Sequence, residues 1–274
     1  MRIKLFLLIL FFSLSFTQNT NQWKLSVQMW TFHISNFEDA LNRVDSCGIH
    51  YIEIYPGQKI NSLSNDVIGP SLSEDKIEQL KKSIAVHPIK VISYGVVTCD
   101  KREEWESHFQ FARDMNISVI TAEPNKEDLD FVNMLAGKYK IKVAIHDHPK
   151  PSLYWHPDSV LQALQNRSNM GVCADIGHWV RNGLNVTDCL KKLRGHIIEL
   201  HFKDVLPDLN DKNNFAGYVD VDLGKGLCNI ETVLKELKYQ NFNGFFTMEH
   251  EANWCCNVQD LIINKKYYLK KMKT

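Results

Sequence analysis

One unit of sequence recurs eight times along this chain. Each unit joins a stretch with apolar residues at helical spacing, a short turn with Gly or Asn, an apolar and β-branched run, and a polar cluster. The eight runs expected to form strands are KLSVQMW (24–30), YIEIYP (51–56), IKVISYGVV (89–97), ISVITAEP (117–124), IKVAIHDHP (141–149), MGVCADIGH (170–178), HIIELHFKD (196–204) and GFFTMEHE (244–251). Strands that alternate with helices pair in parallel through right-handed crossovers. Eight such units in about 250 residues predict a closed (β/α)₈ TIM barrel, an α/β fold of one domain.

Helical periodicity supports the same interpretation. Amphipathic stretches lie between several of the runs, among them 38–48, 73–86, 101–115, 185–195 and 229–241. Ser73 is expected to cap a helix at its N-terminus, and Gly48 and Gly195 are expected to end helices. A doubly wound open sheet is the alternative fold. However, QMWTFHIS follows the first run, where such a sheet would have a glycine-rich phosphate loop.

The N-terminus has the features of a secretory signal peptide. Arg2 and Lys4 precede an apolar run from Leu5 to about Phe16, and a polar stretch follows. The run is shorter than the roughly 20 apolar residues that span a bilayer. We therefore expect a signal peptide at 1–18, a barrel over 22–274, and a secreted or periplasmic protein with no stable membrane span after cleavage. An uncleaved membrane anchor is the alternative.

Charge and cysteine content exclude several classes of protein. Lys plus Arg and Asp plus Glu are equal at 32 each, so no overall field attracts the chain to nucleic acid. The seven cysteines are an odd number without CxxC spacing, which indicates neither a zinc knuckle nor a disulfide framework. In an oxidising compartment one or two pairs could form, but the sequence does not select them. It does not indicate an oligomeric state either.

Polar side chains gather where the predicted strands end. In a (β/α)₈ barrel the reactive groups lie at these carboxyl ends. The strand-end candidates are Gln28, Trp30, Glu53, Tyr55, Glu123, His146, His148, Asp175, His178, Glu199, His201, Lys203, Glu249 and Glu251. Residues two apart on a strand share a face, so His146 with His148, His201 with Lys203, and Glu249 with Glu251 each point the same way.

Charged groups that face a barrel interior are costly unless something neutralises them. One divalent cation would do so, and the mixed oxygen and nitrogen donors favour Mn²⁺ or Zn²⁺, with Mg²⁺, Co²⁺ and Fe²⁺ as alternatives. Asp175, His201 and Glu249 end three successive predicted strands and are the leading ligand candidates. Five other histidines are assigned structural roles: His33, His50, His87, His108 and His156. Because no thiolate is among the likely donors, an open catalytic site is expected rather than a closed structural one.

Several of these segments resemble a known family. They are CADIGHWVRNGLNVTDCLKKLRGHIIELHFKDV (173–205), QMWTF, YIEIYPGQ, AIHDHPKPSLYWHPD, LGKG and FFTMEHE. Together they resemble the sugar phosphate isomerase/epimerase family of xylose isomerase-like TIM barrels, over essentially the whole mature chain. The DxxH motif, the HxK strand and the final ExE strand carry the resemblance. These motifs are fairly specific for the superfamily and much less specific for substrate.

The resemblance implies one divalent metal held by a Glu, Asp, His, Glu set. Asp175 matches the aspartate, His201 the histidine and Glu249 the last glutamate. His146 stands where the epimerases have the first glutamate. We expect Glu123, one strand earlier, to supply that ligand, with His146 or His148 as the alternative. This departure argues against a symmetric two-glutamate epimerisation.

Such a site suits proton abstraction next to a carbonyl, so we expect a metal-dependent sugar isomerase or epimerase that acts through an enediolate. Glu249 is expected to be ligand and general base, while Lys203 with His178 or His146 polarises the substrate oxygen or returns the proton. The side chains expected to bind the sugar are Trp30, Tyr55, His148, Trp179 and Glu251. Gly177 is expected to let the chain turn after Asp175.

Two alternatives remain open for the activity. The first is a metal-dependent lyase on 3-keto-glycosides, or a dehydratase, because export favours free or oxidised sugars and glycosides over phosphorylated sugars. The second is a secreted carbohydrate-binding barrel without catalysis.

Overall fold

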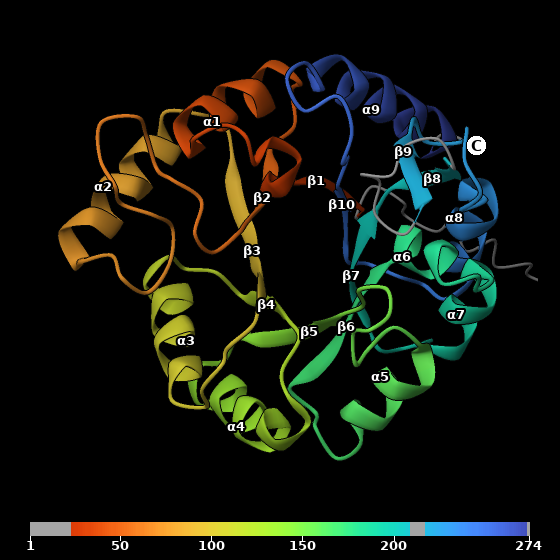
Figure 1. Ribbon diagram of the computed structural model, residues 1–274, viewed down its shortest axis with the longest axis horizontal. Helices are drawn as coiled ribbons and strands as arrows, with labels where there is room; N and C mark the ends of the chain where they lie inside the picture. Colours follow the sequence, from red (N-terminus) through yellow and green to blue (C-terminus); the bar gives the residue numbers. More distant parts are fainter. Residues whose placement is uncertain (1–22, 209–216, 273–274) are drawn as a thin grey trace, which may run out of the picture.

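A closed barrel of eight parallel strands forms the centre of the computed structural model, which describes residues 23–208 and 217–272 (Figure 1). The strands follow the order β1-β10-β7-β6-β5-β4-β3-β2 around the barrel. Their bounds are β1 Lys24–Gln28, β2 Tyr51–Ile54, β3 Lys90–Val97, β4 Val119–Ala122, β5 Lys142–His146, β6 Met170–Asp175, β7 Ile197–Phe202 and β10 Phe245–Met248. Each lies within one of the eight predicted runs, which confirms the (β/α)₈ barrel. The predicted signal peptide lies outside the described residues.

Helices surround the strands on the outside of the barrel (Figure 1). Their bounds are α1 Phe37–Ser46, α2 Glu74–Ala85, α3 Glu104–Asp114, α4 Leu129–Tyr139, α5 Pro157–Leu164, α6 Ile176–Arg181, α7 Val186–Lys192, α8 Ile230–Tyr239 and α9 Val258–Met272, with short 3₁₀ turns at Met29–Phe32 and Lys126–Asp128. Ser73 is the N-cap residue of α2, although its side chain makes no capping hydrogen bond. Gly48 and Gly195 follow α1 and α7 with φ of 63° and 81°, the left-handed conformation that ends helices.

The barrel interior changes from apolar to polar along the strands. Val119, Ala144 and Cys173 form a small apolar cluster of their own. Two residues further along the same strands, on the same face, stand Thr121, His146 and Asp175, all buried. The strands therefore deliver polar side chains to the interior near their carboxyl ends.

A second, two-stranded sheet lies beside the barrel and was not predicted. It pairs β8 (Asp204–Pro207) with β9 (Tyr218–Val221) in antiparallel fashion. β8 begins two residues after β7, so the sheet stands next to the carboxyl ends of the barrel strands. Within the described ranges, no helix is long and apolar enough to cross a membrane.

Candidate metal centre

A pocket of about 360 Å³ opens at the carboxyl ends of the strands. It is lined by Gln28, Trp30, Tyr55, Pro56, Gly95, Val96, His148, His178, Glu249 and Glu251. Seven of these are strand-end candidates from sequence: Gln28, Trp30, Tyr55, His148, His178, Glu249 and Glu251. In the described part of the chain, the pocket wall contains carboxylates, imidazoles and aromatic rings but no Lys or Arg.

Two aromatic side chains form one wall of the pocket. The rings of Trp30 and Tyr55 meet edge to face at 5.1 Å, and the Trp30 side chain is 42% exposed. The prediction for Trp179 was wrong, because this side chain is fully buried and does not line the pocket. The chain enters α6 directly after Asp175, and the helix turns Trp179 into the core.

Four buried side chains bring their polar atoms together beneath the pocket. His146, Asp175, His201 and Glu249 each place one ligand atom within 4.8 Å of the others. His201 Nδ1 lies 3.1 Å from both His146 Nε2 and Glu249 Oε2. Asp175 Oδ2 lies 3.7 Å from His146 Nε2 and 3.9 Å from His201 Nδ1. Atoms that share a tetrahedral zinc ion lie about 3.3 to 3.6 Å apart, so these spacings suit a divalent ion.

One oxygen of this group has no hydrogen-bond partner. Asp175 Oδ1 accepts from the backbone N–H of His178 at 2.9 Å and caps α6. Asp175 Oδ2 is buried and accepts no hydrogen bond of acceptable geometry, although several cationic and imidazole nitrogens lie 3.1 to 3.9 Å away. A buried carboxylate oxygen without a hydrogen bond is costly even beside the Lys203 ammonium, and a metal ion would satisfy it. The residues present therefore fit a metal.

A further carboxylate supports each imidazole of the group. His201 Nε2 lies 2.7 Å from Glu53 Oε2, and His146 Nδ1 lies 3.1 Å from Glu123 Oε1. Because a carboxylate only accepts, each ring donates at these nitrogens and turns its other nitrogen toward the group. This is the usual arrangement behind histidine ligands of metals.

The structure therefore does not support the preference for Glu123 as the first ligand, because His146 and not Glu123 belongs to the four-residue group. Glu123 instead accepts hydrogen bonds from three neighbouring side chains, those of His146, His148 and Ser152. Burial raises the pKa of Glu123, but its hydrogen bonds with His146 and His148 outweigh burial and lower the pKa below the usual range. The role of His146 in proton return is not supported either, because its ring is buried behind the pocket wall.

Replacing Glu53 by Gln tests the support of His201. The amide accepts the ring N–H less strongly and does not hold the tautomer, so we expect divalent-ion affinity to fall about 10- to 100-fold. Isothermal titration with Mn²⁺ or Zn²⁺ measures the change. Glu78→Gln is the matched control, since the Glu78 side chain is 60% exposed on α2. Unchanged affinity in Glu53→Gln would contradict this role.

Lys203 contacts three carboxylates of the site. Its Nζ lies 3.1 Å from Asp175 Oδ2, 2.9 Å from Glu249 Oε2 and 2.5 Å from Glu251 Oε1. Burial alone would lower the pKa of Lys203, but the three carboxylates hold it well above the usual value. Lys203 therefore stays an ammonium ion, which suits charge compensation better than returning a proton.

Gly177 makes room for this lysine. A Cβ at position 177 would lie 2.5 Å from Lys203 Cγ and 2.7 Å from its Cδ. The expectation that Gly177 permits a turn was wrong, because it lies within α6 and the helix begins there without a break. Its function in the structure is to leave space for the stem of Lys203.

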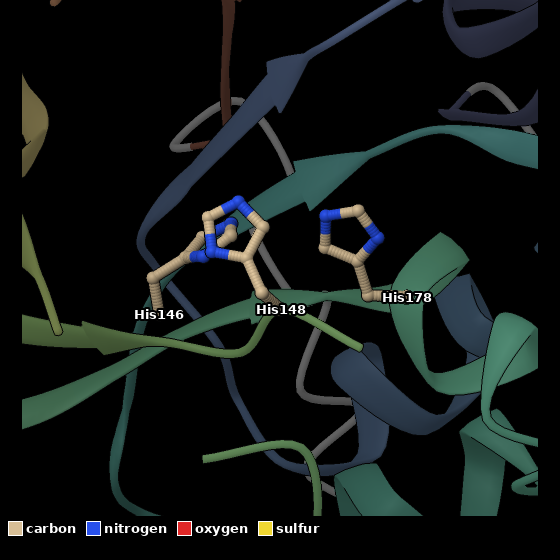
Figure 2. Close-up of side chains that lie close together, drawn as sticks. All are labelled: His146, His148 and His178. Carbon is tan, nitrogen blue, oxygen red and sulfur yellow. The ribbon is translucent and has the colours of Figure 1, made fainter. Parts of the chain in front are cut away.

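Three histidines converge beside the ligand group. His146 and His148 come from the end of β5 and the residues after it, while His178 comes from α6 (Figure 2). Their ring centroids lie 4.4 Å (His146 to His148) and 5.1 Å (His148 to His178) apart. One ligand atom from each lies within 4.8 Å of the others. His148 and His178 line the pocket, so this imidazole cluster joins the buried ligands to the open cavity.

A buried ion pair fixes His178. Arg181 Nη1 lies 3.0 Å from His178 Nδ1, and Arg181 Nη2 donates to Asp220 Oδ1 at 2.6 Å. Because guanidinium only donates, His178 Nδ1 accepts and its proton resides on Nε2. Burial lowers the pKa of His178 well below its usual value, so the ring is neutral. Asp220 also accepts from the backbone N–H of Glu251 at 2.8 Å, which ties β9 to the site.

The family model described as xylose isomerase-like TIM barrel matches residues 41–271. This chain belongs to that family. A crystal structure of an uncharacterized protein from Parabacteroides distasonis ATCC 8503 has 33% sequence identity and a TM-score of 0.72, over 91% of this chain and 99% of that chain. A xylose isomerase-like TIM barrel protein from Mycobacterium smegmatis, solved in complex with magnesium, has a TM-score of 0.72 at 14% identity, over 92% and 97% of the two chains.

A curated relative has a named activity. It is inosose dehydratase from Clostridium botulinum (strain Eklund 17B / Type B), 25% identical over 155 residues, which are 52% of each chain. The alignment thus spans about half the length of the curated relatives that this chain matches.

Three buried side chains in this xylose isomerase-like barrel were not among the candidates from sequence, namely Asp147, Arg181 and Asp220, and Glu53 was a strand-end candidate without an assigned role. Asp147 accepts from the backbone N–H of Asp175 at 2.8 Å and so fixes the start of α6. Its place between two candidate histidines in HDH was a usable signal, and so was the position of Arg181 three residues after His178. No local pattern marks Asp220, because β9 approaches the site only in the folded chain.

Glu199 lies in the polar interior near the ligand group. Its Oε1 accepts from Ser93 at 3.1 Å and from Thr247, while Oε2 is buried without a partner. Burial, with Glu53 close by, raises the pKa of Glu199 to about 8. The folded state therefore holds this proton up to about pH 8, whereas the unfolded chain loses it near 4.5, the ordinary pKa of a glutamate.

Glu199 thus makes stability depend on pH. Between about pH 4.5 and 8 the folded state binds more protons than the unfolded state, so the contribution of Glu199 to stability falls as pH rises. Glu199→Gln mimics the protonated form and removes this dependence. We expect the variant to gain on the order of a few kcal/mol relative to wild type between about pH 5 and pH 8. Urea unfolding of both proteins in the presence of a chelator measures the gain. A difference in the free energy of unfolding that stays constant from about pH 5 to pH 8 would refute the prediction.

Proposed function

We propose that this chain is a metal-dependent sugar isomerase or epimerase that abstracts a proton next to a carbonyl and proceeds through an enediolate. The observation that carries the proposal is the position of Glu249. This carboxylate belongs to the four-residue ligand group and also lines the pocket. A base in contact with both the ion and the substrate can remove a proton from the carbon next to the carbonyl. The negative charge that then develops on the substrate oxygen lies close to the ion.

Charge balance supports one divalent ion. Asp175, Glu249 and Glu251 surround the single ammonium of Lys203. Asp175 and Glu249 would be anionic ligands of one divalent cation, and His146 and His201 would complete the ligand set in their neutral forms, because an imidazole must lose its ring proton to bind a metal. Bound there, Mn²⁺ or Zn²⁺ would supply Lewis-acid stabilisation of negative charge on the substrate oxygens.

Side chains of the site have separate roles in proton transfer and sugar binding. Burial raises the pKa of Glu249, but Lys203 and His201 lower it below the usual range, so Glu249 is ionised and can accept a proton at neutral pH. A carboxylate of low pKa is a weak base, which favours substrates whose C–H is already acidified by a neighbouring carbonyl. His178 carries its proton on Nε2 and can donate it to a substrate oxygen. Trp30 and Tyr55 offer apolar ring faces to a sugar.

The substrate that this pocket favours is an uncharged or oxidised sugar. Among the residues that the structure describes, the pocket wall has no Lys or Arg to bind a phosphate, and Lys203 is already paired with three carboxylates. The predicted signal peptide points the same way, because sugar phosphates are mainly intracellular. Export to the periplasm or the medium is part of this proposal.

A dehydratase or lyase is the second candidate. It is favoured by His146, which stands where the epimerases have the first glutamate and leaves Glu249 as the one carboxylate of the ligand group that lines the pocket. β-Elimination needs one base and one acid, and neutral His178 can protonate the leaving oxygen. The inosose dehydratase similarity agrees with this chemistry.

Incubation with keto and aldo sugars in deuterated water tests these proposals. An isomerase or epimerase will introduce deuterium at the carbon next to the carbonyl, whereas a lyase will yield an unsaturated product. Asp175→Asn is the matched control and should abolish either reaction. If neither deuterium nor an elimination product appears with metal bound, the non-catalytic carbohydrate-binding barrel is the better explanation.

A further inference from the structure

Two adjacent thiols lie in the turn between β10 and α9. All seven cysteines are described; Cys255 and Cys256 are exposed, and the other five are buried. The Sγ atoms of Cys255 and Cys256 lie 2.9 Å apart. The backbone N–H of Cys256 donates to Asn253 O at 2.8 Å, and Asn253 has a φ of 49°. The turn therefore holds two exposed thiols against each other.

This turn is linked to the pocket wall through sequence and ring contacts. It follows Glu249 and Glu251 and includes Trp254. The Trp254 ring stands edge-on to His33 at 4.1 Å, and His33 stacks on Trp30 at 4.8 Å. Since Trp30 lines the pocket, a change in the turn can reach the pocket wall through two ring contacts.

We propose that Cys255 and Cys256 form a reversible vicinal disulfide, a redox modification site that shifts Trp254 against His33. The oxidant is a small-molecule disulfide. One cysteine thiolate attacks it, forms a mixed disulfide and releases one thiol; the second cysteine attacks the mixed disulfide, closes the Cys255–Cys256 bond and releases the other. The two cysteines lose two protons and two electrons, which the external disulfide takes up.

Backbone geometry accounts for the reversibility. Adjacent Cα atoms are about 3.8 Å apart, which is shorter than the roughly 4.4 to 6.8 Å of ordinary disulfides. The ring that closes is therefore strained, and strained disulfides are the easily reduced ones. Exposure of both sulfurs gives small disulfides and thiols access. The inference does not depend on catalysis in the pocket.

Mass spectrometry tests the bond. Full-length protein is equilibrated with glutathione disulfide, quenched in acid, denatured and alkylated. We expect the peptide with Cys255 and Cys256 to lose two hydrogens and take up no alkyl group, and dithiothreitol to restore two alkylation sites. Cys255→Ser and Cys256→Ser should instead stop at the mixed disulfide. Two alkylated thiols, or only mixed disulfides, in the wild type would overturn the proposal.

Tryptophan fluorescence tests the shift of Trp254. Oxidation should change the emission of the wild type, and the change should be absent in Cys256→Ser and strongly reduced in Trp254→Phe. A wild-type disulfide that forms without an emission change dependent on Trp254 would overturn the link to the pocket. Neither readout needs a substrate, so both remain decisive if the proposed sugar chemistry fails.

Discussion

Glu249→Gln is expected to lower kcat/KM by about 10²- to 10⁴-fold, the contribution of a positioned general base. An amide cannot accept the proton, and the variant also replaces a charged candidate ligand by a weaker neutral one. Initial rates on the sugar identified by deuterium exchange measure the effect. Metal content must be determined in parallel, because it separates loss of the base from loss of the ion.

Glu251→Gln is the control for this prediction. Glu251 also lines the pocket and contacts Lys203, but it is outside the four-residue ligand group. We expect a smaller loss of kcat/KM and full metal content. If Glu249→Gln keeps the wild-type rate with the ion bound, another residue is the base and the proposed mechanism is wrong.

Asp175→Asn is expected to remove the metal ion. Asp175 Oδ2 is the buried oxygen without a hydrogen-bond partner, and the amide group of Asn lacks the charge that binds a cation. The affinity should fall by more than the roughly 10- to 100-fold typical of a lost supporting partner. Elemental analysis should find about one divalent ion per wild-type chain and none in the variant. His201→Ala should behave in the same way.

Thermal unfolding gives an independent measurement of the same effect. An ion present at 100 times its Kd stabilises the folded state by about 2.7 kcal/mol. The wild type and the control Asp188→Asn, whose side chain is 74% exposed, should therefore melt at a higher temperature when metal is added. Asp175→Asn should not respond. A wild-type protein that neither retains nor responds to any divalent ion would contradict a metal centre.

The sequence predicted the barrel because periodicity is a local signal. Each strand run is rich in apolar residues, and burial along β6 is complete. The same logic located the strand-end residues Asp175, His201 and Glu249, which the structure brings together. The alternation of residues along a strand does not depend on distant contacts. The strands and their end residues could therefore be predicted from the sequence alone.

What the sequence could not predict depends on contacts between distant segments. Glu123 and His146 end neighbouring strands, and only the folded barrel determines that His146 joins the group while Glu123 supports its ring. Trp179 was misassigned because the strand run extended past Asp175, where the chain already forms α6. The Arg181–Asp220 pair joins residues separated by 39 positions, a distance at which no local pattern operates.

The contact between Gly177 and Lys203 has a consequence for protein engineering. Any side chain at position 177 would displace the stem that carries the ammonium of Lys203. The charge balance of the centre is thus controlled by a residue without a side chain, 26 positions earlier in the sequence. Libraries that aim to change substrate range should keep positions 177 and 203 fixed as one unit and vary the pocket wall instead.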